Sequence, residues 1–319
     1  MHPDPLQQLI GQSAAMDHVR GQIRRFGTAP IPVLILGETG TGKEVCASLI
    51  ASLSGRSPTR AINCAAFTET LVESELFGHE RGAFTGAVRT HTGVIAAAHK
   101  GILFLDEMEE IPMPVQVKLL RTLESGEYQP VGSSLVKRSD FRLLTATNRD
   151  PDELVASGRL RADLLYRLGY ARIWLPPLRQ RREDIPLLAQ EFLKRQVLRG
   201  HSAILAIEAS ARAFLMQQDW PGNVRQLSHV MEAAVAMAGT SRSITVDHLI
   251  EVLTPHRPRP QVTERPFSLA EVRQRAERHA ILDALRVSEG SRERAAALLD
   301  ISIATLYRKL APLDSADPA

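Results

Sequence analysis

A glycine-rich segment between an apolar run and a helix constrains this chain more than any other feature. Residues 33–36, Val-Leu-Ile-Leu, have the composition of a strand buried on both faces of a parallel sheet. Glycines then let backbone N–H groups converge on one anion, a lysine adds a cation, and a helix beginning near that lysine points its positive end the same way. The segment predicts a cradle for nucleotide phosphates, and a glycine-rich turn without a ligand is the alternative. The candidate residues, in the sequence GETGTGKE, are Gly37, Glu38, Thr39, Gly40, Thr41, Gly42, Lys43 and Glu44.

Two acids follow a second apolar strand, in GILFLDE. In a P-loop ATPase the first acid, Asp106, helps to hold Mg²⁺, and the second, Glu107, polarises the attacking water. A strand that happens to end in acids is the alternative, but the upstream cradle favours an ATP and Mg²⁺ site. Glu44 stands where the general motif has Ser or Thr, so Thr41 or water would have to replace that metal ligand.

The order of apolar stretches predicts an α/β fold followed by two helical parts. Over residues 6–177, helical stretches alternate with candidate strands at 33–36, 61–63, 102–105, 141–146 and 171–175. Strand signals disappear over 178–253, where we expect a helical lid subdomain interrupted at Trp220-Pro221-Gly222. A linker with four prolines, 254–267, marks the clearest domain boundary.

The C-terminal region, 268–311, has the pattern of a helix-turn-helix. A capping box at Ser268–Glu271 opens a helix to about Val287, and shorter helices are expected at 292–299 and 303–310. Residues 257–310 hold 11 basic against 7 acidic residues, a modest excess that suits nucleic acid. A helix pair that binds no DNA is the alternative.

Composition indicates a cytoplasmic protein of 319 residues. Cys46 and Cys64 have no partner at metal-ligand spacing, so we expect reduced cysteines in the core. The N-terminus lacks the basic start and apolar stretch of a signal peptide, and no run approaches about 18 apolar residues.

Three further groups of residues are candidates for function. Thr147 and Asn148 end a strand, where they would lie beside the γ-phosphate. Arg161 and Arg167 are expected to reach a neighbouring subunit's nucleotide as arginine fingers, although a surface arginine pair is the alternative. The last group predicts a mobile loop that presents an aromatic side chain outward, with a buried anchoring Phe as the alternative: Gly82, Ala83, Phe84, Thr85, Gly86 and Ala87.

These motifs together resemble the AAA+ domain of bacterial sigma-54-dependent activators, the enhancer-binding proteins. The resemblance rests on GETGTGKE, ESELFGHERGAFTGA, GILFLDEME, LLTATNRD, RADLLYRL, LPPLRQRREDIPLLA and WPGNVRQL over residues 6 to about 253. The stretch AALLDISIATLYRKL is similar to the Fis-type DNA-binding helices of the family. The GAFTGA sequence is the specific element, because very few other ATPases carry it.

The resemblance implies roles for individual residues. Asn63 would be the switch partner of Glu107, Arg225 would reach the nucleotide from the lid, and Phe84 and Thr85 would touch the sigma factor. Glu44 agrees with the family's usage. DNA contacts are expected from Ser302, Thr305, Tyr307, Arg308 and Lys309.

Four positions depart from the family pattern. Pro130, in the sequence EYQPVG, stands where Arg is usual, which puts in doubt any contact made by this second surface loop. Leu160 replaces the usual Phe before the first candidate arginine finger. Asp300 takes the usual Gly of the DNA-binding turn, where a positive φ costs Asp more than Gly. Ile303 replaces Arg, so we expect weaker or less selective DNA binding.

The expected function is that of an ATP-hydrolysing transcriptional activator. It would assemble into a ring, a hexamer in the family's manner, bind upstream DNA and act on sigma-54 RNA polymerase through the GAFTGA loop. No receiver or sensory domain precedes Leu6. Regulation would come from a separate protein, such as a paralogous partner or a trans-acting regulator, or from expression level, as in phage-shock and Hrp-type activators; a segment cut free of its sensor is the alternative. A P-loop ATPase with other remodelling work and a DNA-binding protein with a vestigial nucleotide site are the alternatives.

Overall fold

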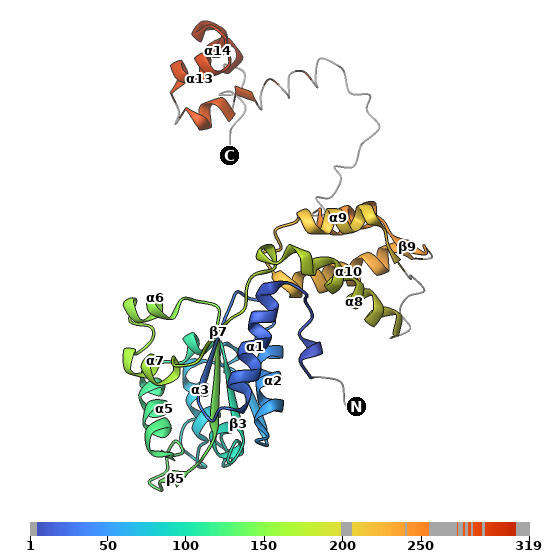
Figure 1. Cartoon of the computed structure of the whole chain (residues 1–319). Helices are drawn as coiled ribbons and strands as arrows, with labels where there is room; N and C mark the ends of the chain where they lie inside the picture. Colours follow the sequence, from blue (N-terminus) through green and yellow to red (C-terminus); the bar gives the residue numbers. More distant parts are fainter. Residues whose placement is uncertain are drawn as a thin grey trace. The chain divides into compact units, whose positions relative to one another are not determined.

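The chain divides into two compact units, Met1–Pro255 and His256–Ala319. The computed structural model describes residues 5–198, 206–239, 241–254 and 291–310, together with 273, 277, 280, 281 and 283–288. The first unit contains a parallel sheet and a helical lid, and the second contains short helices (Figure 1). None of the helices within these described ranges is both long and apolar enough to cross a membrane.

Five strands form the central sheet of the first unit. They lie in the order β2-β3-β6-β1-β7, and each neighbouring pair is parallel. Each strand falls on a stretch where the sequence predicts one, which confirms the α/β fold. Because β1 lies between β6 and β7, the chain that follows β1 leaves the sheet between two neighbouring strands. The strands are β1 (Val33–Leu36), β2 (Thr59–Asn63), β3 (Ile102–Asp106), β6 (Arg142–Thr147) and β7 (Arg172–Trp174).

Alternate residues of β1 are buried on opposite faces of the sheet. The main covering helices are α1 (Ala14–Thr28), α2 (Lys43–Ser54), α3 (Glu69–Phe77), α5 (Met113–Ser125) and α7 (Ala162–Leu168). Ile35 belongs to one apolar cluster with Ile23 of α1 and Leu49 of α2. Leu34 belongs to another with Leu76 of α3 and residues of α5 and α7. Burial on both faces explains why β1 is an uninterrupted apolar run.

The two cysteines lie in these clusters, one on each side of the sheet. Cys46 and Cys64 are buried and form no disulfide, which confirms that they are core residues. Burial raises the pKa of each thiol to about 12. Neither is therefore a thiolate at neutral pH.

Short elements connect the strands of the sheet. One of them, a two-stranded hairpin, was not predicted from the sequence. Strands β4 (Glu127–Tyr128) and β5 (Lys137–Arg138) form an antiparallel hairpin. Two residues per strand are too few to show alternation, which is why the pair gave no signal. The other connecting elements are η1 (Pro5–Gln8), η2 (Cys64–Ala66), α4 (Val94–Ala97), η3 (Met108–Glu110) and α6 (Pro151–Ala156).

The lid has an apolar core of its own, built around Trp220, Leu193 and Met231. The expected break at residues 220–222 is present, because one helix ends at Gln217 and the next begins at Asn223. The expectation that the lid has no strands was wrong, since β8 (Ala206–Ile207) pairs in parallel with β9 (Ser243–Ile244). These strands are also too short to give a periodic signal. The helical elements are η4 (Leu178–Gln180), η5 (Arg182–Asp184), α8 (Ile185–Leu198), α9 (Ala209–Gln217), α10 (Asn223–Ala238) and α11 (Val246–Leu253).

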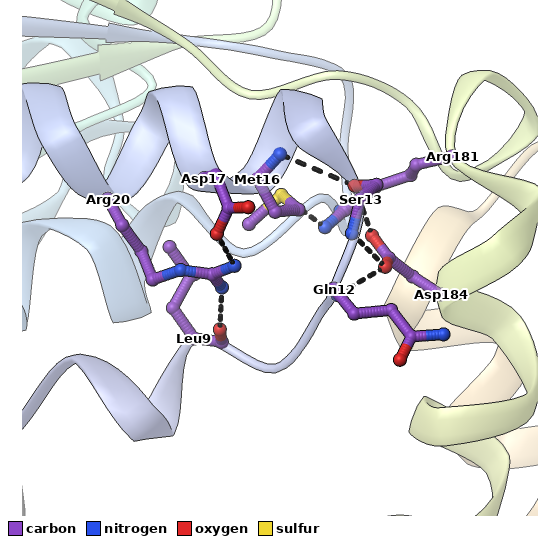
Figure 2. Close-up of polar contacts among 8 residues, drawn as sticks. All are labelled: Leu9, Gln12, Ser13, Met16, Asp17, Arg20, Arg181 and Asp184. Carbon is purple, nitrogen blue, oxygen red and sulfur yellow. Dashed lines mark hydrogen bonds and ion pairs between the residues drawn. The ribbon is translucent and has the colours of Figure 1, made fainter.

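A buried carboxylate at the base of the lid holds the segment that precedes α1. Asp184 accepts hydrogen bonds from the backbone N–H groups of Gln12 and Ser13, at 2.6 and 2.9 Å, and from the Ser13 hydroxyl at 2.7 Å (Figure 2). The Ser13 hydroxyl in turn accepts from the N–H of Met16 and caps α1. The start of α1 is therefore fixed to the lid.

In the second unit, α13 (Arg292–Leu298) and α14 (Ile303–Leu310) form the expected helix pair. Ala295, Ala296 and Leu306 are buried together with Ile281. The described residues between 273 and 287 are helical, whereas the predicted capping box at 268–271 and the linker from residue 255 onward lie outside the described residues. Asp300 has a φ of +51°, so the turn does require the left-handed conformation that was expected at this position.

Candidate functional site

The glycine-rich segment forms a loop between β1 and α2. Gly40 and Gly42 have φ values of +80° and +109°, and α2 begins at Lys43. The Lys43 ammonium donates to the carbonyl oxygens of Gly37 at 2.8 Å and Glu38 at 3.2 Å. Burial lowers the pKa of Lys43, and the carboxylates of Asp106, Glu109 and Glu107 oppose that shift. The loop therefore has the shape and charge of a phosphate cradle.

The predicted acid pair lies at the carboxyl end of β3. The Asp106 carboxylate accepts from the N–H of Glu107 at 3.0 Å. Glu107 has a φ of +53°, a strained conformation for a residue other than glycine. Burial, followed by the charges of Asp106 and Glu109, raises the pKa of Glu107, while Lys43 lowers it. A carboxyl group with a raised pKa beside a phosphate cradle is suited to accepting a proton from water.

A third acid near this pair was not singled out from the sequence. Glu109 is 5 % exposed, and one of its carboxylate oxygens has no hydrogen-bond partner among the described residues. Its charge acts on Lys43, Glu107 and Cys64. Only its position two residues after Glu107 could have drawn attention to it.

The polar ends of β2 and β6 lie on either side of β3. The Asn148 amide donates to the Thr39 hydroxyl of the phosphate loop at 3.2 Å. Thr147 is fully buried, and its hydroxyl accepts from the N–H of Arg149. Asn63 is paired in register with Asp106, and its side-chain oxygen accepts from the N–H of Ala65 at 2.8 Å. Asn148 is thus the residue of the Thr147-Asn148 pair that reaches the loop.

A pocket of about 280 Å³ lies between the phosphate loop, the acid pair and the lid. The predicted lid residue, Arg225, lines it from α10, and its backbone N–H donates to the Gly40 carbonyl at 3.2 Å. The lining residues are Thr39, Gly40, Gly42, Lys43, Glu44, Val45, Asp106, Glu107, Phe192, Val224, Arg225, Ser228 and His229.

The two candidate arginine fingers do not belong to the described lining of this pocket. Arg161 precedes α7 and forms two hydrogen bonds with the Asp163 carboxylate, at 3.0 and 2.7 Å. Arg167, in the last turn of α7, donates to the carbonyl of Leu123. Both side chains are at the surface of the protomer.

The GAFTGA segment forms a closed loop whose aromatic residue is at the surface. The N–H of Gly82 donates to the Ala87 carbonyl at 2.8 Å, and Phe84 is 38 % exposed. The rings of Phe84 and His79 meet edge to face with 4.9 Å between their centroids. Phe84 is therefore not the fully buried anchor of the alternative interpretation.

The second loop, between β4 and β5, is joined to the base of the GAFTGA loop. The N–H of Glu80 donates to the Val131 carbonyl at 3.0 Å, and the N–H of Val131 donates to the Gly78 carbonyl at 2.8 Å. These contacts use the backbone, so they form although Pro130 stands where the family usually has Arg.

The candidate DNA-contact residues differ in how they are engaged. Tyr307 is 48 % exposed, and the Arg292 guanidinium lies 5.1 Å from the centre of its ring. The Lys309 ammonium is 2.5 Å from a Glu277 carboxylate oxygen, and the hydroxyls of Ser302 and Thr305 are 2.8 Å apart. Arg308 is exposed.

Three family comparisons agree with this arrangement. Residues 9–174 match the Sigma-54 interaction domain, 179–266 match the AAA+ ATPase lid domain, and 273–312 match the Fis family of bacterial regulatory proteins. The chain belongs to the sigma-54-dependent transcriptional regulators. The resemblance of the chain to the sigma-54-dependent activators is thereby confirmed.

Two of the relatives of this sigma-54-dependent regulator are similar over nearly all of its length, and a third over about three quarters of it. It is 41% identical over 304 residues to the transcriptional regulatory protein ZraR of Salmonella typhimurium, covering 95% of this chain and 68% of ZraR. It is 42% identical over 313 residues to the regulatory protein LuxO of Vibrio cholerae, covering 95% of this chain and 69% of LuxO. The Nif-specific regulatory protein of Herbaspirillum seropedicae is 47% identical over 234 residues, which are 73% of this chain and 43% of that protein.

Solved structures share the fold of the regulator. NtrX from Brucella abortus in complex with ATP superimposes with a TM-score of 0.71 at 30% identity, covering 96% of this chain and 69% of NtrX. A RuvB mutant from Thermotoga maritima gives a TM-score of 0.55 at 16% identity, covering 98% of this chain and 92% of that one. The second likeness concerns the AAA+ fold alone.

Proposed function

We propose that the chain hydrolyses ATP in a ring, a hexamer in the manner of its family, and uses the energy to open promoter complexes of sigma-54 RNA polymerase. The observation that carries the proposal is a single pocket lined by Lys43, Asp106, Glu107 and Arg225, in a chain whose Phe84 is presented on a surface loop. Membership of the sigma-54-dependent regulators supports the choice of polymerase as partner. The Fis-type helices support binding of upstream DNA.

The hydrolytic step follows from the groups in the pocket. The loop N–H groups and Lys43 bind the phosphates, which requires the Lys43 ammonium to leave the Gly37 and Glu38 carbonyls. Glu107 takes a proton from the attacking water, and its raised pKa makes it a stronger base than an ordinary glutamate. Asn148, which donates to the Thr39 hydroxyl, and Arg225, which lines the pocket from the lid, would bind the γ-phosphate. Asn63 would act as the switch partner of Glu107 after leaving the N–H of Ala65.

The residues present also fit Mg²⁺. The described residues contain no group of three or more side chains able to form a protein cage for a metal, and Asp106 contributes one carboxylate to the lining of the phosphate site. Mg²⁺ is commonly held in this way, by one carboxylate, substrate phosphates and water. The Thr41 hydroxyl donates to the Glu38 carbonyl at 2.8 Å and is buried, so water is the better substitute for a Ser or Thr ligand at position 44. When bound, the ion would neutralise charge on the β- and γ-phosphates.

The arginines and the GAFTGA loop act outside the protomer. Arg161 and Arg167 lie at the surface and would stabilise the transition state in a neighbouring subunit, after Arg161 leaves Asp163. Residues 82–87 would contact the sigma factor through Phe84 and Thr85. Coupling between ATP turnover and this loop is what distinguishes an activator from another AAA+ remodelling protein.

An ATP-dependent open-complex assay with purified sigma-54 polymerase tests the proposal. The intact chain should give open complexes with ATP, and a chain that ends at Leu253 should need a higher protein concentration because it lacks the DNA-binding helices. Phe84→Ala should retain most ATPase activity and lose open complexes, while Glu107→Gln should bind ATP without turnover. An intact chain that hydrolyses no ATP, or a Phe84→Ala variant that opens promoters normally, would contradict the proposal.

A further inference from the structure

The phosphate loop touches the lid through its backbone, without an intervening side chain. A Cβ atom added to Gly40 would lie 2.3 Å from the Gly222 carbonyl oxygen, closer than real atoms approach. The Gly40 carbonyl also accepts from the N–H of Arg225. Gly40 is therefore needed for the close approach of the lid as well as for its positive φ.

One acidic side chain of the loop joins the two sides of this contact. The Glu38 carboxylate accepts from both terminal nitrogens of Arg179, at 2.7 and 2.5 Å, and from the Asn223 amide at 3.1 Å. The hydrogen bonds from Arg179 are the largest influence on Glu38 and lower its pKa. An ionised carboxylate beside a phosphate cradle would repel the nucleotide, and the Arg179 guanidinium offsets that charge.

Asn223 is the second lid residue in the contact, and its surroundings fix its orientation. It is fully buried, donates also to the Thr39 carbonyl at 3.0 Å and accepts from the N–H of Leu178 at 2.8 Å. Its φ of +51° and that of Trp220, +53°, are left-handed, a conformation that Asn tolerates better than most residues. The hydrogen bonds to Glu38 and Thr39 hold the turn against the loop, and the one from Leu178 fixes the orientation of the amide from within the lid.

Arg181 supplies a further connection from the same lid segment. Its side chain is 2 % exposed and donates to the carbonyl of Thr41 at 3.1 Å. It also donates to the Met16 sulfur at 2.8 Å (Figure 2). The base of the lid thus contacts the phosphate loop at Glu38, Thr39, Gly40 and Thr41 in succession.

We propose that Glu38, Arg179 and Asn223 form a latch that sets the angle of the lid against the phosphate loop, and that nucleotide phosphates act on the lid through this latch. The inference rests on the proposed binding of ATP at this loop. The mechanism begins at Lys43, which donates to the Glu38 carbonyl and would release it on turning toward a phosphate. The freed loop backbone carries the Glu38 carboxylate with it, and Arg179 and Asn223 pass the shift to α10. All three are positioning residues, because Arg225, two residues beyond Asn223, is the lid side chain that lines the pocket.

Arg182 provides a matched control within the same segment. Its guanidinium forms an ion pair with Asp219 at 2.8 Å and donates to the Met216 carbonyl, so its contacts stay inside the lid. Its side chain is 41 % exposed, and so is that of Arg179. Arg182→Ala and Arg179→Ala therefore remove similar surface arginines, of which only Arg179 reaches the phosphate loop.

The test measures the distance between the lid and the part of the chain that contains the sheet, within a single protomer. Cysteines introduced at the exposed positions Thr28 on α1 and Ala213 on α9 carry spin labels, and the buried natural cysteines stay unlabelled. Labelled protein is diluted with unlabelled protein so that each measured pair lies in one protomer. We expect a narrow distance distribution in the parent and Arg182→Ala proteins, and a broader one in Arg179→Ala and Asn223→Asp. Arg179→Lys should restore part of the narrow distribution, because it keeps the charge and one hydrogen bond.

Kinetics of the same variants separate a latch from a general loop defect. Asn223→Asp keeps the left-handed residue and the acceptor for Leu178 but sets a carboxylate against Glu38. We expect Arg179→Ala and Asn223→Asp to lose at least about fivefold in kcat for ATP while the Kd of a fluorescent ADP changes less than about twofold. Distance distributions identical to the parent in both variants, or equal losses of kcat and of ADP affinity, would overturn the latch. Absence of turnover in the parent would instead contradict the proposed function, and the distances without nucleotide would still decide on the latch.

Discussion

At the scale of single residues, the environment of Glu107 ties the activity to pH. Burial and the nearby carboxylates of Asp106 and Glu109 raise its pKa, so the ionised base is lost at a higher pH than for an ordinary glutamate. Activity that depends on this base is present above its pKa and falls as the pH drops through it. Glu109 contributes although it is not expected to contact the nucleotide.

Glu109→Gln should therefore shift the acid limb of the ATPase pH profile to lower pH. The substitution removes a negative charge that disfavours ionisation of Glu107 and keeps the size of the buried side chain. The measurement is kcat for ATP as a function of pH. Glu110→Gln is the control, because Glu110 has the smallest of the named effects on Glu107 and pairs with Arg159 at the surface. An acid limb that moves equally in both variants would contradict the assignment of Glu109.

Gly40 and Gly55 separate two reasons why a position requires glycine, namely a positive φ and the close approach of another part of the backbone. Both have positive φ, +80° and +67°, but a Cβ on Gly55 would meet no atom within 4 Å, whereas one on Gly40 would overlap the lid backbone. We expect Gly55→Ala to lower the free energy of unfolding by about 1 kcal/mol and Gly40→Ala by roughly 2 to 4 kcal/mol. Urea unfolding followed by circular dichroism measures both. Equal losses would show that the φ angle alone decides at Gly40.

At the scale of helices, strands and loops, much of the arrangement could be predicted because the signal is local. The inner strands β1 and β3 are buried on both faces, and each contains a continuous run of four apolar residues. Strand β6 is buried along its whole length although it contains Arg142, Thr145 and Thr147, and the edge strands β2 and β7 are mostly exposed. The phosphate loop, the acid pair and α14 could also be predicted, because the pattern that identifies each one lies within a few consecutive residues. The short strands β4, β5, β8 and β9 offered two residues each and no pattern.

The latch could not be predicted for a different reason. Arg179 and Asn223 meet Glu38 from 141 and 185 residues away, and nothing in the sequence pairs them. Similarly, the contact between the Arg292 guanidinium and Tyr307 joins two helices of the DNA-binding unit. The motif WPGNVRQL did indicate Arg225, but the residue that fixes the turn against the loop is Asn223.

Helix α14 carries a testable departure from the family. Ile303, its first residue, is 42 % exposed where Arg is usual, so one cation is missing from the surface expected to face DNA. Ile303→Arg should tighten binding and steepen the dependence of log K on log salt by about 1, the change expected for one added phosphate contact. Binding titrations at several salt concentrations provide the measurement. Ile303→Gln serves as the uncharged control, and a salt slope unchanged in the Arg variant would contradict a phosphate contact at this position.

At the scale of the whole molecule, the proposed arginine fingers would make ATP hydrolysis depend on neighbouring subunits. Arg161 and Arg167 lie at the surface and away from the pocket that their own protomer provides. A protomer without Lys43 can still lend its arginines, and one without Arg161 can still bind ATP. Turnover should accordingly depend on protein concentration.

Mixing Lys43→Ala and Arg161→Ala chains should therefore restore ATPase activity that each lacks alone. In random rings from an equal mixture, about a quarter of the interfaces combine an intact site with an intact finger, so we expect up to about a quarter of the parent activity. The measurement is turnover per protomer across mixing ratios, with a Lys43→Ala, Arg161→Ala double variant in place of one partner as the control. Mixtures no more active than their components would contradict action in trans.

The hydrogen bonds from Gln12 and Ser13 to Asp184 also couple the beginning of α1 mechanically to the lid. Tension applied to the backbone at residue 12 passes directly to the base of the lid, since its carboxylate anchors two successive amides and a hydroxyl. These hydrogen bonds transmit force in both directions, so a movement of the lid would also displace the segment that leads into Gln12. A domain fused before Gln12 could thus respond to each movement of the lid through tension in the backbone, without contacting the nucleotide.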